Sequence, residues 1–210
     1  MRRAKWIWVT MLGVMSVHLA LAGEPSFSGL FFSLNGSLAS TNIELSDENT
    51  KIRSLGESSA NGFAQVGFGY SAADRTVFSI GATYRLPDLK AGQISIVDAV
   101  SKLSATRNYS IYFEPGFTVA EKSLIYALVS YEGARGVGQV TALSTAETVK
   151  GRKNINGLGF GFGARSFIND VAFIQIQVKK LQFDYEPIIG TSAGYEPEAV
   201  EGSVGFGFRY

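Results

Sequence analysis

Apolar and polar residues alternate strictly along eight segments of the chain, and this alternation is its dominant pattern. A period of two is typical of β-strands, because successive side chains point to opposite faces. The segments are about 28–40, 61–70, 77–86, 107–119, 124–132, 155–166, 171–185 and 200–210. The fifth is the least regular, and residues 180–185 lose the alternation, which predicts a bulge or an extension beyond the apolar zone. The sequence therefore predicts an all-β fold of eight strands.

The connections between these segments alternate in length. Those after the second, fourth and sixth strands are short, at about 71–76, 120–123 and 167–170. Those after the first, third, fifth and seventh strands are long, at about 41–60, 87–106, 133–154 and 186–199. Antiparallel neighbours joined in this way form an up-and-down meander. We expect three short turns at one end of the molecule and four long loops at the other.

The two faces of the predicted strands differ in chemistry. One face carries large apolar residues such as Phe32, Ile80 and Phe160, whereas the other carries Gly, Ser, Asn, Gln and a few charges. The second face is too small and polar for an ordinary soluble core, so the apolar face is expected to point outward to lipid. Backbone groups in lipid must all be paired, so such a sheet must close on itself. The sequence predicts an eight-stranded antiparallel transmembrane β-barrel with a polar, small-residue lumen, extracellular loops and periplasmic turns.

The first 22 residues differ from the rest of the chain. Three basic residues among the first five are followed by an apolar run over about 6–19, and Ala20 and Ala22 form an A-x-A cleavage pattern. These features are typical of a secretory signal peptide. A membrane-anchor helix is the alternative, but the run is short for a spanning helix. We expect residues 1–22 to be cleaved after Ala22 and residues 23–210 to form the barrel.

Removal of this leader leaves 16 Lys and Arg against 18 Asp and Glu, and no Cys, His, Trp or Met. Without His or Cys the usual transition-metal sites are unavailable, so no metal or cofactor is expected. The near-neutral charge gives no reason to expect nucleic acid as a partner.

The stretch "GTSAG" (190–194) matches the nucleophile-elbow pattern, but no His could activate Ser192. We therefore interpret it as a loop tip and expect no enzymatic activity.

Seven charged residues fall on the inward face of the predicted strands. From the long-loop end to the short-turn end they are Arg85, Glu132, Lys179 and Glu201, then Glu114, then Arg165 and Arg209. An isolated buried charge is very costly, so these charges are expected to pair. They could form an ion-selective constriction or gate, or a plug of ion pairs. We favour the plug, because an eight-stranded barrel leaves little room for water.

Two stretches resemble a known family. The end of the chain, "VGFGFRY", is similar to the C-terminal signal by which outer-membrane barrels are recognised by their assembly machinery, although such signals more often end in Phe. The residues that carry this resemblance are Val204, Phe206, Phe208 and Tyr210. The stretch "NGLGFGFGARSFINDVAFIQIQ" resembles the sixth strand, turn and seventh strand of the small OmpA-like, opacity-like and porin-family β-barrels of Gram-negative bacteria.

The resemblance implies a place in the Gram-negative outer membrane after Sec-type export. It implies membrane lipid, lipopolysaccharide and the barrel assembly machinery as partners. It is specific for architecture and weak for activity, because the family holds adhesins, structural barrels and narrow channels. We expect a structural or surface role, in membrane integrity, adhesion or host interaction through the loops. A narrow channel for ions or small solutes is the alternative, followed by an outer-membrane hydrolase. The polar long loops could contact a host or cell-surface ligand or merely cap the barrel.

Overall fold

The computed structural model describes residues 27–47, 50–86, 89–96, 99–142, 148–184, 186–187 and 194–210. The leader with its cleavage pattern at Ala20 and Ala22 lies outside these residues, as does Ser192. The strands are β1 (Gly29–Asp47), β2 (Thr50–Ala73), β3 (Thr76–Arg85), β4 (Leu89–Ile96), β5 (Ala99–Ala120), β6 (Ser123–Ala142), β7 (Thr148–Phe167), β8 (Ala172–Phe183), β9 (Glu186–Pro187) and β10 (Gly194–Arg209). Within the described ranges, no helix is long and apolar enough to cross a membrane.

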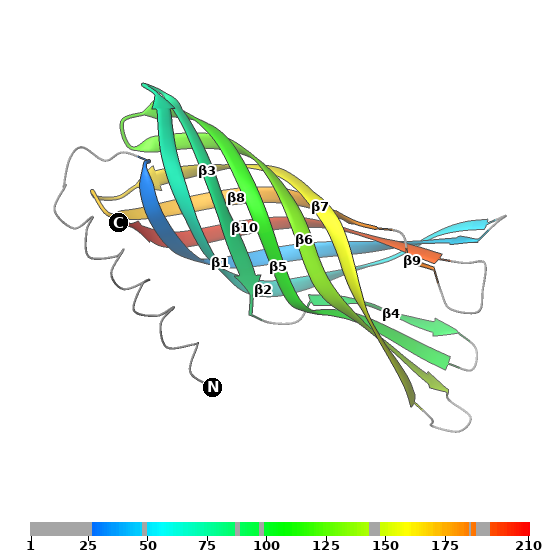
Figure 1. Cartoon of the computed structure of the whole chain (residues 1–210). Coiled ribbons are helices and arrows are strands. Elements are labelled where there is room, and N and C mark those ends of the chain that lie inside the picture. The colour runs from blue at the N-terminus through cyan, green and yellow to red at the C-terminus, as the bar shows by residue number, and fades with distance from the viewer. Residues whose placement is uncertain are drawn as a thin grey trace, which may run out of the picture.

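Eight of these strands close into a barrel (Figure 1). The order around the wall is β1-β2-β3-β5-β6-β7-β8-β10, and every neighbouring pair is antiparallel. The barrel closes because β10 also pairs with β1, from Phe31 opposite Arg209 to Ser46 opposite Gly194. Closure leaves no unpaired edge in the wall, as lipid requires. The predicted eight-stranded antiparallel barrel is confirmed.

The strands reach much further at the long-loop end than the alternation indicates. Residues 41–47, 50–60, 99–106, 133–142, 148–154 and 194–199, all expected to lie in long loops, belong to paired strands. The added strand β4 pairs with β5 within the second of these connections. Apolar alternation marks only the part of a strand that has one apolar face, whereas backbone pairing continues beyond it. The predicted strand lengths therefore correspond to the apolar zone alone.

Beyond that zone the wall separates into two sheets. Pairing of β7 with β8 ends at Gly157 opposite Phe183, and pairing of β2 with β3 ends at Phe63 opposite Arg85. Past these points β4, β5, β6 and β7 remain paired as one sheet, and β1, β2, β9 and β10 as another. The two sheets extend to the right of the barrel in Figure 1. We call them the β4–β7 sheet and the β1–β10 sheet.

The outward faces of the barrel strands form an apolar belt. Large apolar side chains on these faces are 38–72% exposed. They include Phe32, Leu34, Phe68, Ile80, Ile111, Phe113, Ile125, Phe160, Phe162, Ile174, Ile176, Val204 and Phe206. A monomeric soluble protein rarely exposes so large a continuous apolar surface, whereas such a belt is typical of a barrel in a bilayer.

The upper half of β8 corrects one expectation. Pairing of β8 with β7 and with β10 runs without a register shift, so the suspected bulge at residues 180–185 is wrong as far as Phe183, where the strand ends. The alternative, an extension beyond the apolar zone, is the observed one. Here the faces exchange chemistry: Lys180 points outward, whereas Leu181 and Phe183 are buried in the barrel. In this part of β8 a charged residue faces outward and apolar residues pack inside. Nearer the short turns apolar residues face outward and polar residues point inside.

Candidate functional site

Three layers of side chains fill the lumen. Nearest the short turns lies an apolar floor made of Phe27, Phe31, Val77, Tyr112, Leu124, Tyr126, Leu128, Phe167 and Phe173. The Phe173 ring is fully buried and meets those of Phe31 and Phe167 edge-on, at centroid distances of 6.1 and 5.9 Å. A polar layer follows. A second apolar cluster, made of Ala39, Ala134, Ile155, Leu181, Phe183 and Ala199, lies toward the long-loop end.

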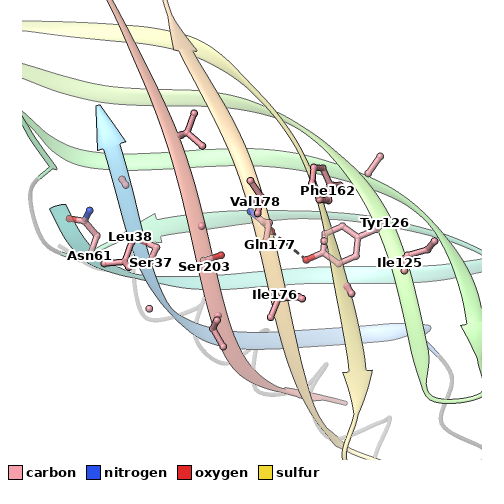
Figure 2. Close-up of a pocket in the computed structure, with 18 of the residues that line it drawn as sticks. Ser37, Leu38, Asn61, Ile125, Tyr126, Phe162, Ile176, Gln177, Val178 and Ser203 are labelled. Carbon is pink, nitrogen blue, oxygen red and sulfur yellow. Dashed lines mark hydrogen bonds between the residues drawn. The ribbon is translucent and has the colours of Figure 1, made fainter. Parts of the chain in front are cut away.

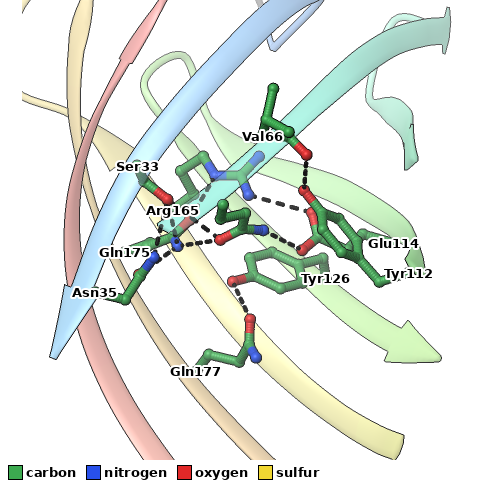
Figure 3. A network of polar contacts seen from close by, with 10 residues as sticks. Ser33, Asn35, Val66, Tyr112, Glu114, Tyr126, Arg165, Gln175 and Gln177 are labelled. Carbon is green, nitrogen blue, oxygen red and sulfur yellow. Dashed lines mark hydrogen bonds and ion pairs between the residues drawn. The ribbon is translucent and has the colours of Figure 1, made fainter. Parts of the chain in front are cut away.

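The centre of the polar layer is one connected network (Figure 3). Arg165 Nη2 lies 3.2 Å from Glu114 Oε2 in an ion pair with both groups at most 3% exposed. Gln65 donates a hydrogen bond to Glu114 Oε1 at 3.3 Å. Gln175 accepts a hydrogen bond from Arg165 Nε at 3.2 Å and donates to Gln65 and Asn35, both at 2.7 Å. Since buried charges are tolerated only when fully partnered, this arrangement fixes both ions in place.

Arg165 reaches this network from a strand position near the short turns. Its guanidinium carbon lies 4.2 Å from the centroid of the Phe31 ring, 5.3 Å from that of Tyr126 and 5.1 Å from that of Phe173. Aromatic faces attract a cation, most strongly where water is excluded. Arg165 therefore joins the aromatic floor to the polar layer. Its guanidinium group pairs with Glu114 and lies among three aromatic rings.

Two further ion pairs lie nearer the long-loop end. Lys179 Nζ lies 3.0 Å from Glu132 Oε1, which also accepts a hydrogen bond of 2.6 Å from Ser130. Arg85 forms an ion pair with Glu201, and both side chains are at most 7% exposed. These four ions come from β3, β6, β8 and β10, so each pair links two strands that are not neighbours in the wall: β6 with β8 across β7, and β3 with β10 across β1 and β2.

Arg209 occupies a different place from the other six predicted lumen charges. It is half-buried at the short-turn end, where its Nη2 donates a hydrogen bond of 2.9 Å to the backbone oxygen of Asp170. Its Nη1 lies 3.5 Å from the backbone oxygen of Ser28, and its guanidinium carbon 5.4 Å from the Phe167 ring centroid. Arg209 thus closes the floor beside the last short turn.

Sequence reasoning missed the amide partners of the central network. Gln65 and Asn35 are neutral, so a search for charges passes over them. The signal that could have identified them is their place in the alternation. Each adjoins an outward apolar residue along its strand, Val66 for Gln65 and Leu34 for Asn35, so each points into the lumen. An amide supplies both a donor and an acceptor, which lets it link one ion to the next.

The glycines of β7 make room for these lumen side chains. A Cβ atom at Gly163 would come within 2.5 Å of Tyr126 Oη and 2.6 Å of the backbone oxygen of Ile176. At Gly159 it would meet Ser130 and Glu132. The lack of a side chain at these positions therefore leaves space for large groups of the neighbouring strand β6.

Residues that outline a space at mid-height lie on both sides of the wall (Figure 2). Tyr126, Gln177 and Ser203 face the lumen, are at most 8% exposed, and Tyr126 donates a hydrogen bond of 3.4 Å to Gln177. Leu38 and Phe162 face outward and are 72% and 67% exposed. The backbone itself separates these two groups of side chains, so they do not line a single passage. The side chains on the lumen side of this region are buried.

The residues that carry the predicted assembly signal lie on the outward face of β10 and, for Tyr210, directly after its end. Val204, Phe206, Phe208 and Tyr210 are 64%, 45%, 41% and 46% exposed. The rings of Phe206 and Phe208 meet edge-on at 5.0 Å, and the backbone N–H of Tyr210 donates to the oxygen of Leu30 at 2.7 Å. The end of the chain is thus part of the apolar belt and of the closing seam between β10 and β1.

Nothing in the described part of the chain gathers three or more residues able to hold a metal ion. The buried acidic groups Glu114, Glu132 and Glu201 each face a cation instead. These lumen charges are therefore neutralised by one another.

An exposed ion pair provides a contrast to the buried ones. Lys180 Nζ lies 3.0 Å from Glu198 Oε1 on the outer surface, the same distance as in the Lys179–Glu132 pair, but the two side chains are 53% and 37% exposed. We expect Lys180→Ala to change the free energy of unfolding by less than about 1 kcal/mol, because water screens an exposed pair. Denaturant unfolding of the folded barrel measures this, and a loss of several kcal/mol would contradict it.

No family model matches the chain, and no curated protein sequence matches it. Among solved structures it is similar to the outer-membrane protease OmpT of Escherichia coli, with a TM-score of 0.51 and 6% identity over 88% of this chain and 98% of that chain. It is also similar to Ail, the attachment invasion locus protein of Yersinia pestis (TM-score 0.47, 11% identity, 87% and 99% covered). A third similar structure is OprG of Pseudomonas aeruginosa (TM-score 0.39, 12% identity, 89% and 98% covered). At these identities the likeness is one of fold, and the chain has the fold of outer-membrane β-barrels.

Proposed function

We propose that this protein is a non-enzymatic barrel of the Gram-negative outer membrane, with a closed lumen and a surface role carried by its long-loop end. The observation that carries the proposal is the lumen, in which three ion pairs and an amide network lie between two apolar clusters. A scaffold packed in this way holds its outer parts rigidly, and binding sites are often on loops that a rigid scaffold carries. The surface role is adhesion, host interaction or maintenance of membrane integrity.

The apolar belt supports the membrane location, because only lipid covers such a surface without cost. Export by the Sec route, cleavage after Ala22 and delivery to the assembly machinery through Val204, Phe206, Phe208 and Tyr210 belong to the same proposal. Membrane lipid and lipopolysaccharide then surround the wall. In this proposal the long-loop end, with its two sheets, lies on the extracellular side of the membrane.

The channel hypothesis has less support. A conducting lumen needs a continuous path of water, and the charges that would line it are paired and almost inaccessible, with Glu114, Glu201 and Arg165 at most 3% exposed. Clusters of apolar side chains above and below the polar layer would each add a dry constriction. Such constrictions oppose ion passage by excluding water.

An enzymatic role has the least support. OmpT is a protease, so the fold by itself does not decide between an enzyme and a non-enzyme. Beyond the leader this chain has no His and no Cys to act as a base or a nucleophile. Each buried carboxylate faces a cation inside the barrel, where a substrate could not reach it.

Shortening the two sheets tests the surface role. We expect a variant that lacks residues 138–151 and 44–53, with each gap closed by Asn-Gly, to fold but to lose cell attachment or to sensitise cells to detergent. The barrel and its lumen pairs lie outside both deletions. The control is an equal amount of folded, heat-modifiable protein at the cell surface. Unchanged attachment together with unchanged detergent resistance would contradict a surface role.

A further inference from the structure

The part of the β4–β7 sheet beyond the apolar belt carries only positive charge on three of its strands. Residues 99–107 of β5, 133–142 of β6 and 148–157 of β7 contain six basic residues and no Asp or Glu. The six are Lys102, Arg107, Arg135, Lys150, Arg152 and Lys153. The corresponding parts of the β1–β10 sheet are acidic, with Glu44, Asp47, Glu57, Glu186, Glu196 and Glu198 against Lys51 and Arg53. The two sheets therefore have opposite charge, and only the β4–β7 sheet would attract anions.

The pairing register places two of these arginines together on the outer surface. Arg135 of β6 lies opposite Asn154 of β7, and Arg152 of β7 lies opposite Val137 of β6. Arg135 and Arg152 are thus diagonal neighbours on one face, a relation that brings side chains within about 7–8 Å. That face is the outward one, because Arg135 follows the exposed Tyr131 at even spacing along β6. Arg152 is exposed and Arg135 half-buried.

A backbone irregularity adds a third arginine. The register of β5 against β6 shifts between Thr106 and Tyr109, and Arg107 within this bulge has a φ of 53°. A left-handed conformation is costly for a side chain such as arginine and is normally left to glycine or asparagine. Its neighbour Thr106 pairs with Arg135, so the bulge places the exposed Arg107 next to the position of Arg135, on the strand on the other side of β6 from Arg152. We call Arg107, Arg135 and Arg152 the basic face.

The basic face begins where the apolar belt ends. Tyr109, two residues from Arg107, and Tyr131, four residues from Arg135, are outward aromatic residues of the belt and are 49% and 47% exposed. Aromatic side chains of this kind mark the level of the lipid headgroups in membrane barrels. The three arginines therefore lie at the height of the groups just above the hydrocarbon layer.

We propose that the basic face binds the phosphate groups of the glycolipid that surrounds the barrel in the outer leaflet. This inference rests on the proposed outer-membrane location. Arginine suits phosphate, because its planar fork donates two parallel hydrogen bonds to one anion. A lipid is favoured over a soluble polyanion because of where the basic face lies. It adjoins the edge of the lipid-facing belt at Tyr109 and Tyr131, and it is away from the far ends of the two sheets. The basic face presents three cations at this height, and the adjoining parts of β5, β6 and β7 contain no Asp or Glu that would compete for them.

The test measures binding of lipid A, a glucosamine lipid with two phosphates, to the folded barrel. The protein is purified folded from membranes, and fluorescent lipid A is titrated in zwitterionic micelles, with dephosphorylated lipid A in a parallel arm. The test variant is Arg107→Gly, Arg135→Gln and Arg152→Gln combined. The matched control removes three exposed cations elsewhere, Arg75→Gln, Lys122→Gln and Lys180→Gln. Arg107→Gly alone is the second variant, since glycine suits the backbone at this position and should not weaken the fold.

We expect each lost arginine to weaken binding of lipid A roughly fivefold, and the triple variant to bind roughly a hundredfold more weakly. The control triple variant should bind as the unchanged protein does, and binding should fall as salt is raised. Equal binding by the triple variant, or equal binding of dephosphorylated lipid A, would overturn the proposal. So would selective loss of binding to a soluble sulfated glycan with lipid A binding unaffected. Absence of the protein from the outer-membrane fraction would instead contradict the proposed function.

Discussion

Replacing Glu114 by leucine is expected to lower the free energy of unfolding by about 3–5 kcal/mol, because it strands Arg165 as an uncompensated buried charge. Glu114 lies 3.2 Å from Arg165 and accepts a second hydrogen bond from Gln65. Neither partner has access to water, since both ends of this ion pair are at most 3% exposed. The three rings around Arg165 cannot replace a full negative charge. Reversible urea unfolding of the barrel in lipid vesicles measures the loss.

The matched control removes both charges. In Glu114→Leu with Arg165→Leu no ion is left unpaired, so most of the lost stability should return. Glu114→Gln keeps the shape and some hydrogen bonds and should fall between the two. A change of less than about 1 kcal/mol in Glu114→Leu would mean that water reaches the pair and that the lumen is not dry.

Reversing Lys179 to glutamate is expected to prevent stable folding or to lower the free energy of unfolding by at least about 3–5 kcal/mol. The new carboxylate would face Glu132, whose Oε1 lies 3.0 Å from the present ammonium group. Two buried carboxylates that face each other repel, and both lack the cation that a buried carboxylate needs. Heat-dependent gel mobility reports whether the barrel folds, and denaturant unfolding reports its stability.

Exchanging the two charges tests whether pairing is the cause. Lys179→Glu combined with Glu132→Lys restores an opposite-charge pair between β6 and β8 and should recover much of the folded yield. Failure of Lys179→Glu to fold, with no recovery in the exchanged variant, would assign the effect to local packing. Normal stability of Lys179→Glu alone would show that the lumen at this height is filled with water.

The barrel could be predicted from the sequence because lipid outside and polar groups inside impose a period of two on each strand. The prediction fails where that contrast ends. Leu181 and Phe183 are buried inside while Lys180 and Gln182 are exposed, so the alternation continues in the structure with its chemistry inverted. Because the prediction relies on apolar residues on the outer face, the inverted pattern looks like a loss of alternation in this part of the strand. The paired strands beyond the belt are hidden from the sequence for the same reason.

The charges of the lumen could be identified from the sequence, but their pairing could not. Counting residues from the turns separates Arg165 from Glu114, yet the structure joins them, since an arginine side chain is long and tilted strands shift neighbouring positions along the barrel axis. Arg209 has the right parity for the lumen but lies at the rim, where backbone oxygens of Asp170 and Ser28 lie within hydrogen-bonding distance. The left-handed backbone at Arg107 has no signature in the sequence, because arginine does not favour it.

The most direct measurement of a closed lumen is planar-bilayer conductance of the folded protein, with folding verified by heat-dependent gel mobility. The packed layers predict silence: insertion without reproducible single-channel steps, in the unchanged protein and in Lys180→Ala alike. Steady steps of a single size, with an ion selectivity that changes when Lys179 or Glu114 is replaced, would show a water-filled lumen. That result would contradict the closed barrel and assign function to the inward charges instead of the two outer sheets.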